Sequence, residues 1–239
     1  MSYYRTQYSP QIGVGGPITP GVKALIIANV SVFGLQVLAD KFGNLAIEGI
    51  FGLTPATVLK NGWLFQLVTY MFLHSTAWLG HLLLNMLMLW MFGTEVERAW
   101  GTRGFIRYYF VCGVGAGLIT CLFNYPIYPT VPTIGASGAI FGVMLAYGLL
   151  YPDRKIFFWF IFPMRAISFV LLCTGIEMFS LLGIQDGVAH FAHLGGMLSG
   201  YLYMKRVWRL GAFWSDLRWR LRRRRFRVMR GDDEQYPFH

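Results

Sequence analysis

Charged side chains are scarce in this sequence. Asp, Glu, Lys and Arg make up 13% of its 239 residues, whereas a soluble domain carries about 25%. The charge that is present is also unevenly placed, because 11 of the 21 Lys and Arg residues follow Met204. The part of the chain before Met204 is therefore more apolar still. This composition excludes an ordinary soluble domain and is typical of a helical protein that crosses a membrane several times.

Cysteine is rare as well. The three cysteines, Cys112, Cys121 and Cys173, all lie in apolar segments. Cys112 and Cys121 would be about 13 Å apart along one helix axis, which is too far for a disulfide bond. The sequence therefore predicts no disulfide framework. Residues 1–20 lack the basic-then-apolar layout of a cleavable signal peptide, so we expect the first membrane helix to be retained.

Six apolar segments are long enough to cross the hydrocarbon core, which needs about 20 residues. The segments are residues 22–39, 79–96, 104–123, 135–151, 157–180 and 188–205. The sequence thus predicts an all-α polytopic membrane protein with six transmembrane helices. It also predicts three parts: a lead over residues 1–21, a membrane domain over 22–205 and a basic tail over 206–239.

Basic residues occur in alternate connections between these segments. The connections after the third and fifth segments have no basic residue, and the long connection after the first segment has only Lys41 and Lys60. The positive-inside rule then places both termini in the cytoplasm. Short uncharged loops favour a bacterial plasma membrane, with an organelle membrane left open. We expect the tail to contact anionic lipid and not nucleic acid, because it directly follows an apolar helix. The basic residues on the cytoplasmic side are Arg5, Lys23, Arg98, Arg103, Arg107, Arg154, Lys155 and the cations of the tail.

The first outer connection, residues 40–78, is too apolar to be an ordinary solvated loop and too interrupted to span. Trp63, Tyr70 and Trp78 are of the residue types that prefer the head-group region. We therefore expect an interfacial or re-entrant segment.

A few polar side chains lie inside the apolar segments, where each is energetically costly and is by default a candidate functional residue. The ordinary alternative is a hydrogen bond to a neighbouring helix. The predicted topology puts all of them except Glu177 near the outer ends of the second, fourth and sixth helices, in one layer. Glu177 is expected to reach the interface late in the fifth helix. These residues are His81, Asn85, Ser137, Glu177, His190 and His193.

Small residues mark the faces on which the fourth and sixth helices can approach closely. His193 lies three residues before Gly196 and seven before Gly200, so it shares one face of the sixth helix with them. On the fourth helix, Ser137 is next to Gly138 in the sequence. A contact between Ser137 and His193 is therefore expected. The small residues are Gly138 and Gly142 on the fourth helix and Ala192, Gly196 and Gly200 on the sixth.

A serine hydroxyl becomes a useful nucleophile when a base such as His takes its proton. The backbone N–H of Ser137, at a helix N-terminus, is unpaired within the helix. This N–H could join donors from His81 and Asn85, which are four residues apart on one face, to form an oxyanion hole. The residues therefore indicate acyl-transfer chemistry.

Four strings resemble those of the rhomboid intramembrane serine proteases: "HLLLN", "GTEVERAWG", "GASGAIFG" and "AHLGGMLSG". The resemblance covers roughly residues 22–205 in the family's order and implies a rhomboid-like bundle. It also implies that Ser137 is the nucleophile, that His193 is the base, and that His81, Asn85 and the Ser137 N–H hold the oxyanion. His193 is preferred to His190 because only His193 begins the string H-x-x-G-x-x-x-G.

The resemblance implies supporting roles for further residues. Gly135 would keep the backbone open beside the nucleophile, and Phe141 would flank the catalytic His. Glu97 and Arg98 would stabilise the cytoplasmic link. One departure from the family is that Trp63 is not followed by Arg. The supporting set is Gly135, Gly138, Phe141, His190, Gly196 and Gly200.

The predicted activity is cleavage of transmembrane segments of membrane proteins near the outer face, with no cofactor and no metal. A zinc site built from His74, His81 and the paired His residues is the metal alternative, but no H-E-x-x-H motif or Cys ligand accompanies it. A second alternative is a non-catalytic rhomboid-like protein that binds membrane helices. A third is a transporter or channel, which the lack of an internal repeat disfavours.

Overall fold

The structure is a computed structural model and describes residues 16–43, 47–158, 162–183 and 190–205. The chain divides into two compact units, Met1–Tyr203 and Met204–His239. Of the second unit, Met204 and Lys205 are the described residues, so the fold below is that of the first unit. The predicted basic tail and residues 1–15 of the predicted lead lie outside the described residues.

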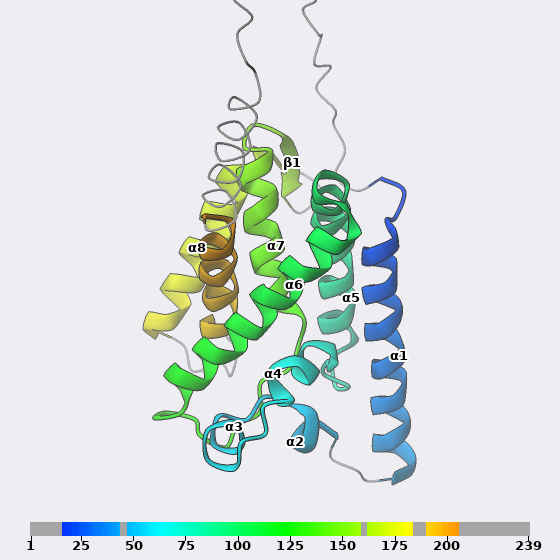
Figure 1. The fold of residues 1–239 in the computed structure, drawn as a ribbon, viewed down its shortest axis with the longest axis vertical. Coiled ribbons are helices and arrows are strands. Elements are labelled where there is room, and N and C mark those ends of the chain that lie inside the picture. The colour runs from blue at the N-terminus through cyan, green and yellow to red at the C-terminus, as the bar shows by residue number, and fades with distance from the viewer. Residues whose placement is uncertain (1–15, 44–46, 159–161, 184–189, 206–239) are drawn as a thin grey trace, which may run out of the picture. The chain divides into compact units, whose positions relative to one another are not determined.

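The described part of the first unit is mostly helical (Figure 1). By length and composition, two of its helical stretches could cross a membrane, Pro20–Gly43 and Leu79–Asn124, while Ser137–Leu150 and Ala166–Leu181 are shorter apolar helices. The number of six spans therefore stays a prediction. The longer helices are α1 (Pro20–Gly43), α5 (Leu79–Met88), α6 (Thr94–Asn124), α7 (Ser137–Leu150) and α8 (Ala166–Gly183), and residues 190–205 are helical too.

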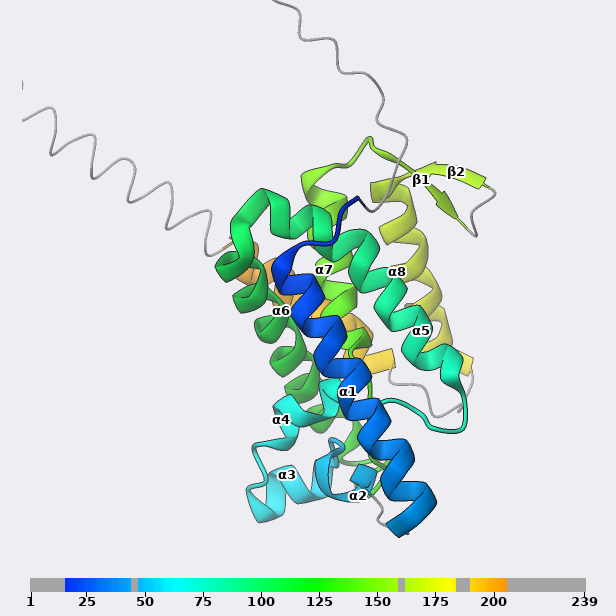
Figure 2. The same cartoon turned by 90° about the vertical axis from the view of Figure 1, so that its right-hand side faces the viewer.

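The stretch from Leu79 to Asn124 is not one straight helix. A π-helical segment, η2 (Leu89–Gly93), joins α5 to α6, and within α6 Gly101 leaves the helical conformation with φ 71° and ψ 163°. Glycine reaches such a positive φ without the clash that a Cβ would make. Figures 1 and 2 both show the chain reversing direction between α5 and the long later part of α6. The stretch thus holds the second and third predicted segments as two separate helices.

The start of the fifth predicted segment is wrong. Instead of a helix from residue 157, the chain forms the antiparallel strands β1 (Lys155–Phe158) and β2 (Phe162–Arg165), with Lys155 opposite Arg165. Pro163 lacks a backbone N–H and biases the residue before it towards extended backbone. The aromatic and β-branched side chains of β1 also favour a strand. The helix α8 begins only at Ala166, after the hairpin.

The first long connection folds into short helices instead of a span. Both views show these helices gathered at the opposite end of the unit from the β1–β2 hairpin (Figures 1 and 2). Gln66 ties them together, because its buried amide donates to the Ile50 carbonyl (2.9 Å) and accepts from the Thr57 hydroxyl (2.6 Å). The elements are α2 (Ile47–Phe51), α3 (Pro55–Asn61), α4 (Gln66–Thr69) and the 3₁₀ helix η1 (Tyr70–Phe72). The interfacial position of this connection stays a prediction.

Helix α7 is packed tightly on two sides, and its glycines make this approach feasible. A Cβ added to Gly142 would lie 2.5 Å from the Cys112 Sγ of α6 and 2.9 Å from the Gly196 carbonyl oxygen. A Cβ added to Gly196 would collide with the Gly138 carbonyl oxygen, and one added to Gly200 would collide with the Tyr108 hydroxyl. The backbones of α7 and of helix 190–205 are therefore in direct contact.

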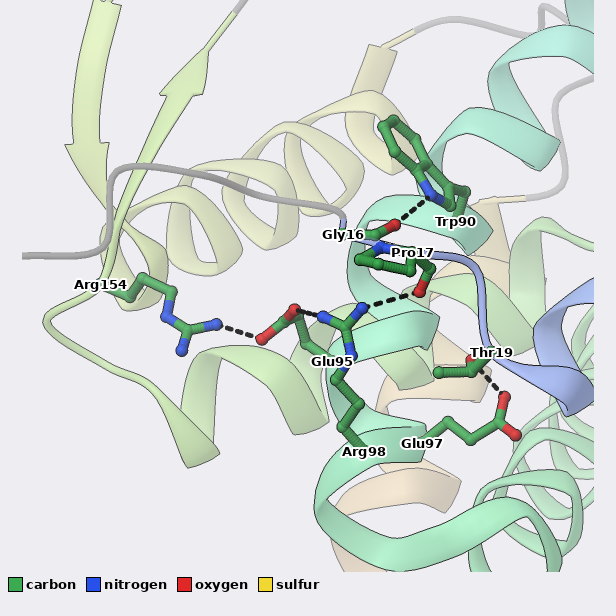
Figure 3. Close-up of polar contacts among 8 residues, drawn as sticks. All are labelled: Gly16, Pro17, Thr19, Trp90, Glu95, Glu97, Arg98 and Arg154. Carbon is green, nitrogen blue, oxygen red and sulfur yellow. Dashed lines mark hydrogen bonds and ion pairs between the residues drawn. The ribbon is translucent and has the colours of Figure 1, made fainter.

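Glu97 holds the start of α1. Its carboxylate accepts hydrogen bonds from the Gly21 and Val22 amides (both 2.8 Å) and from the hydroxyls of Thr19 (2.5 Å) and Thr102 (2.6 Å). The first amides of a helix have no partner within it, and a carboxylate there also meets the positive end of the helix dipole. Figure 3 shows the Thr19 contact. Glu97 therefore fastens α1 to the link before Gly101.

Glu95, near Glu97 in α6, links the segment before α1 with the turn after α7. Its carboxylate contacts both Arg98 and Arg154, and Arg98 also donates to the Pro17 carbonyl at 2.7 Å (Figure 3). Arg154 follows α7, and Pro17 precedes α1. Three segments that are distant in the sequence thus meet around one carboxylate.

Candidate active site

Ser137 is the first residue of α7 and follows a strained turn. Gly135 has φ 123°, a conformation that L side chains rarely adopt, and its amide donates to the Tyr70 carbonyl at 2.9 Å. The amides of the first helical turn have no partner within the helix and carry the positive end of its dipole. The chain thus presents the Ser137 hydroxyl beside unpaired backbone donors.

His193 lies directly beside this hydroxyl. Its Nε2 is 2.8 Å from the Ser137 Oγ. The imidazole is buried and stacks on the ring of Phe141, with ring centroids 4.3 Å apart and planes 3° from parallel. Phe141 therefore limits rotation of the imidazole, so the ring presents Nε2 to the serine.

His81 approaches the same place from α5. Its Nδ1 accepts a hydrogen bond from the Ser75 amide at 3.3 Å, so a neutral His81 carries its proton on Nε2. A Cβ at Gly135 would lie 2.8 Å from that Nε2 and 3.7 Å from the Ser137 Oγ. The missing Gly135 side chain therefore leaves a space that an N–H donor and the serine hydroxyl both line.

Asn85 is buried one turn further along α5. Its Nδ2 donates to the His81 carbonyl at 2.7 Å, while its Oδ1 has no hydrogen-bond partner among the described residues. One amide hydrogen is thus used within its own helix. A donor role towards an oxyanion would use the second hydrogen.

Two residues near His81 were not predicted to belong to a serine active site: His74 was named only for the alternative zinc site, and Gln36 was not named. The His74 ring meets the His81 ring edge to face, with centroids 5.1 Å apart. The side chain of Gln36 in α1 holds the His74 backbone, because it donates to the His74 carbonyl (3.1 Å) and accepts from the His74 amide (3.0 Å). A polar Gln inside the first apolar segment was the sequence signal for this contact.

His74 is completely buried, and neither ring nitrogen has a hydrogen-bond partner among the described residues. Burial, with a smaller contribution from the neighbouring His81, lowers the pKa of His74 to about 4, while the Phe72 carbonyl acts in the opposite direction. His74 is therefore neutral at pH 7 and packs as an uncharged ring behind His81.

The expectation that Glu177 reaches the interface is wrong. Its side chain in α8 is buried, and its carboxylate lies between two imidazoles. Oε2 is 2.7 Å from the His190 Nδ1, and Oε1 is 2.9 Å from the His193 Nδ1. An unpaired carboxylate inside an apolar helix has a high free-energy cost, and partners on a neighbouring helix lower that cost. Glu177, His190 and His193 are also the described residues whose ligand atoms lie close enough to hold one metal ion.

The fold and the site together define a helical protein with apolar helices and a paired Ser and His at the ends of adjoining helices. The family model described as the rhomboid domain matches residues 61–210. This match covers more than half of the chain. The chain therefore belongs to the rhomboid family.

Among curated proteins, the chain is similar to rhomboid relatives from plants, yeast and bacteria. It is 32% identical to RHOMBOID-like protein 4 of Arabidopsis thaliana over 66% of this chain and 38% of that protein. It is 31% identical to the mitochondrial Rhomboid protein 1 of Saccharomyces cerevisiae, over 76% of this chain and 51% of that protein. It is also 31% identical to Rhomboid protease GluP of Bacillus subtilis, over 63% and 27%. The chain thus spans about half or less of the length of these relatives.

Proposed function

We propose that this chain is an intramembrane serine endopeptidase that cleaves transmembrane segments of other membrane proteins near the outer membrane face. The observation that carries the proposal is the 2.8 Å distance between the Ser137 Oγ and the His193 Nε2. A base within hydrogen-bond reach is what a serine hydroxyl needs in order to act as a nucleophile. The similarity to a protein named a rhomboid protease supports the same activity.

In the proposed reaction, Ser137 attacks the carbonyl carbon of the scissile peptide bond while its proton moves to the His193 Nε2. The carbonyl oxygen becomes an oxyanion, held by the Ser137 N–H, the His81 Nε2–H and the second amide hydrogen of Asn85. The His193 proton then passes to the leaving amine, which leaves an acyl group on Ser137. Water hydrolyses this acyl-enzyme, and no cofactor or metal takes part.

The remaining residues of the proposed site hold the reacting groups in position. Gly135 keeps the oxyanion space open, and Phe141 fixes the plane of the His193 ring. The glycine contacts between Gly138 and Gly196 set the distance between the two helices that carry Ser137 and His193. Gly200 contributes to the same packing.

The proposed topology has six spans within a membrane domain over residues 22–205, with both termini cytoplasmic. The three connections that meet at Glu95 and Arg98 support it, because all three are predicted to be on the cytoplasmic side. The connection over residues 40–78 would then lie at the outer interface. The basic tail over 206–239 would contact anionic lipid.

The test is cleavage of a single-span membrane substrate by the purified full chain and by Ser137→Ala, His193→Ala and His190→Ala, with and without a chelator. We expect no cleavage by the first two variants, retained cleavage by His190→Ala, and no effect of the chelator. Labelling by a fluorophosphonate should occur in the wild type and not in Ser137→Ala. Unchanged cleavage by Ser137→Ala would end the serine mechanism. A wild type that neither cleaves nor takes the label would point to a non-catalytic, helix-binding protein.

A further inference from the structure

Glu177 is the one carboxylate that the structure brings to the candidate active site among the described residues. Each of its oxygens faces a different imidazole: Oε1 is 2.9 Å from the His193 Nδ1, and Oε2 is 2.7 Å from the His190 Nδ1. The side chains of all three residues are 11% exposed. The carboxylate is therefore shielded from water and held by two partners from the next helix.

The position of this contact on the His193 ring matters for its chemistry. Nε2 faces the Ser137 hydroxyl and Nδ1 faces the carboxylate, so the two nitrogens have different partners. A neutral imidazole that is to accept the serine proton on Nε2 must carry its own proton on Nδ1. An acceptor beside Nδ1 favours that tautomer and orients the ring. The Nδ1–H is not in line with Oε1, so at 2.9 Å the carboxylate acts on the ring through its charge and not through a hydrogen bond.

We propose that Ser137, His193 and Glu177 form a catalytic triad in this chain, with Glu177 as the positioning residue of the base. This inference rests on the proposed function. When Ser137 attacks, its proton moves to Nε2 and the imidazole becomes a cation. Glu177 keeps its negative charge and stabilises that cation, and no proton passes to it. The second carboxylate oxygen faces the His190 Nδ1 at 2.7 Å and does not contact the base.

A metal ion is the alternative for Glu177, His190 and His193, because one ligand atom from each lies within 4.8 Å of the other two. Tetrahedral zinc with bonds of about 2.0–2.1 Å keeps its ligand atoms about 3.3 Å apart. The two N···O distances of 2.7 and 2.9 Å are shorter than this spacing, and the His190 contact is a hydrogen bond. A metal on the His193 Nδ1 would also withdraw electron density from the base. The geometry therefore favours a carboxylate that acts on the imidazole directly.

The experiment compares the full chain with Glu177→Gln, which removes the charge and keeps the shape. We expect kcat for a single-span substrate to fall at least about 100-fold with KM unchanged, because the amide allows the wrong imidazole tautomer. The rate of fluorophosphonate labelling at Ser137 should fall by a similar factor. Glu177→Asp should recover part of the loss, since it restores the charge. Asp153→Asn is the matched control, because its carboxylate is 82% exposed and pairs only with Arg165 among the described residues; it should behave as wild type.

Glu177→Met provides a second variant, should the buried amide of Gln prevent folding. An apolar side chain of similar size is often tolerated in place of a buried ion, and the same loss of kcat is expected. A folded Glu177→Gln or Glu177→Met that keeps kcat within twofold of wild type would overturn the triad while leaving the serine mechanism intact. Loss of wild-type activity in a chelator, with recovery on addition of zinc, would replace the triad with a metal centre. A wild type that takes no fluorophosphonate label would overturn the proposed function and the triad together.

Discussion

Gly135 combines two constraints that point to the same small residue. Its φ of 123° is strained for any side chain, and a Cβ there would lie 2.8 Å from the His81 Nε2. Glycine is therefore required both for the turn before α7 and for the space between His81 and Ser137. The backbone and the candidate oxyanion hole depend on the same position.

Gly135→Ala is expected to lower kcat by about 100-fold, the loss found when one oxyanion donor is removed, because the methyl group displaces His81. The matched control is Gly62→Ala. Gly62 also has a positive φ, 70°, but no atom lies within 4 Å of its added Cβ. The control should lose about 1 kcal/mol of stability and keep its cleavage rate. Equal activity of the two variants would show that the space beside Ser137 is not used.

The burial of His74 makes the stability of the connection over residues 40–78 depend on pH. Its pKa of about 4 in the folded protein is below the ordinary value of 6.5. Between these values the unfolded chain binds more protons, so the stabilising contribution is complete above pH 6.5 and is lost as the pH falls towards 4. We expect wild type to lose about 2 kcal/mol from this residue between pH 8 and pH 5. His74→Phe should not show this part of the loss.

The measurement is the thermal unfolding midpoint in detergent at pH 8 and pH 5 for both proteins. Titration of other groups is common to the two proteins, so only the difference between them reports on His74. Parallel pH dependences in wild type and His74→Phe would contradict the assignment of a neutral, buried His74.

At the scale of helices, the contact between α7 and residues 190–205 sets the distance between Ser137 and His193. Gly138 and Gly196 bring the two backbones together, and Cys112 and Tyr108 of α6 close the opposite side. The packing on Gly196 involves a backbone carbonyl, which cannot rotate away as a side chain can. The two helices therefore have little freedom to accept a larger residue.

Gly196→Ala is expected to separate these helices, to destabilise the protein by about 1–3 kcal/mol as overpacked cores do, and to reduce cleavage with it. Gly34→Ala in α1 is the matched control, because an added Cβ there meets no atom within 4 Å. Gly34→Ala should keep its activity and should not lower its unfolding midpoint, because Ala favours a helix more than Gly does. The readouts are the unfolding midpoint in detergent and the cleavage rate of the single-span substrate. Wild-type stability in Gly196→Ala would contradict the tight approach.

At the scale of the whole first unit, the polar contacts of Glu95, Glu97 and Arg98 join the start of α1, the first turns of α6 and the turn after α7 (Figure 3). The short helices α2, α3 and α4 gather at the opposite end (Figures 1 and 2). The basic connections and the long first connection are thus at opposite ends of the unit. Such a separation is what a membrane-crossing orientation with a cytoplasmic basic end requires.

This orientation predicts which cysteines a membrane-impermeant maleimide reaches. In a background without Cys112, Cys121 and Cys173, Asp153→Cys should react only from the cytoplasmic side. Lys60→Cys in α3 should react only from the outer side, since both positions are exposed. The measurement is labelling of intact and of inverted membrane vesicles. Labelling of both positions from the same side would contradict the predicted topology.

The sequence by itself determined the local features of this protein. The apolar segments, the helix starts near Ser137 and His81, and the family membership could all be predicted, because the transfer of side chains into lipid and the spacing of residues along a helix are local properties. The helix predicted over residues 157–180 was wrong at its start, because Pro163 and the aromatic residues near it lie in the paired strands β1 and β2. Apolar composition alone does not distinguish these two structures.

Only the tertiary structure decided which polar side chains meet. The Gln36 side chain of α1 meets the backbone of His74 in the connection before α5, and Glu177 of α8 meets His190 and His193 of the following helix. Their contacts depend on how each helix is rotated about its axis and on the rotamer of each side chain, and neither can be read from the spacing of residues along the chain. The sequence therefore indicated a Ser–His pair, while the packing of α8 against residues 190–205 added the carboxylate beside it.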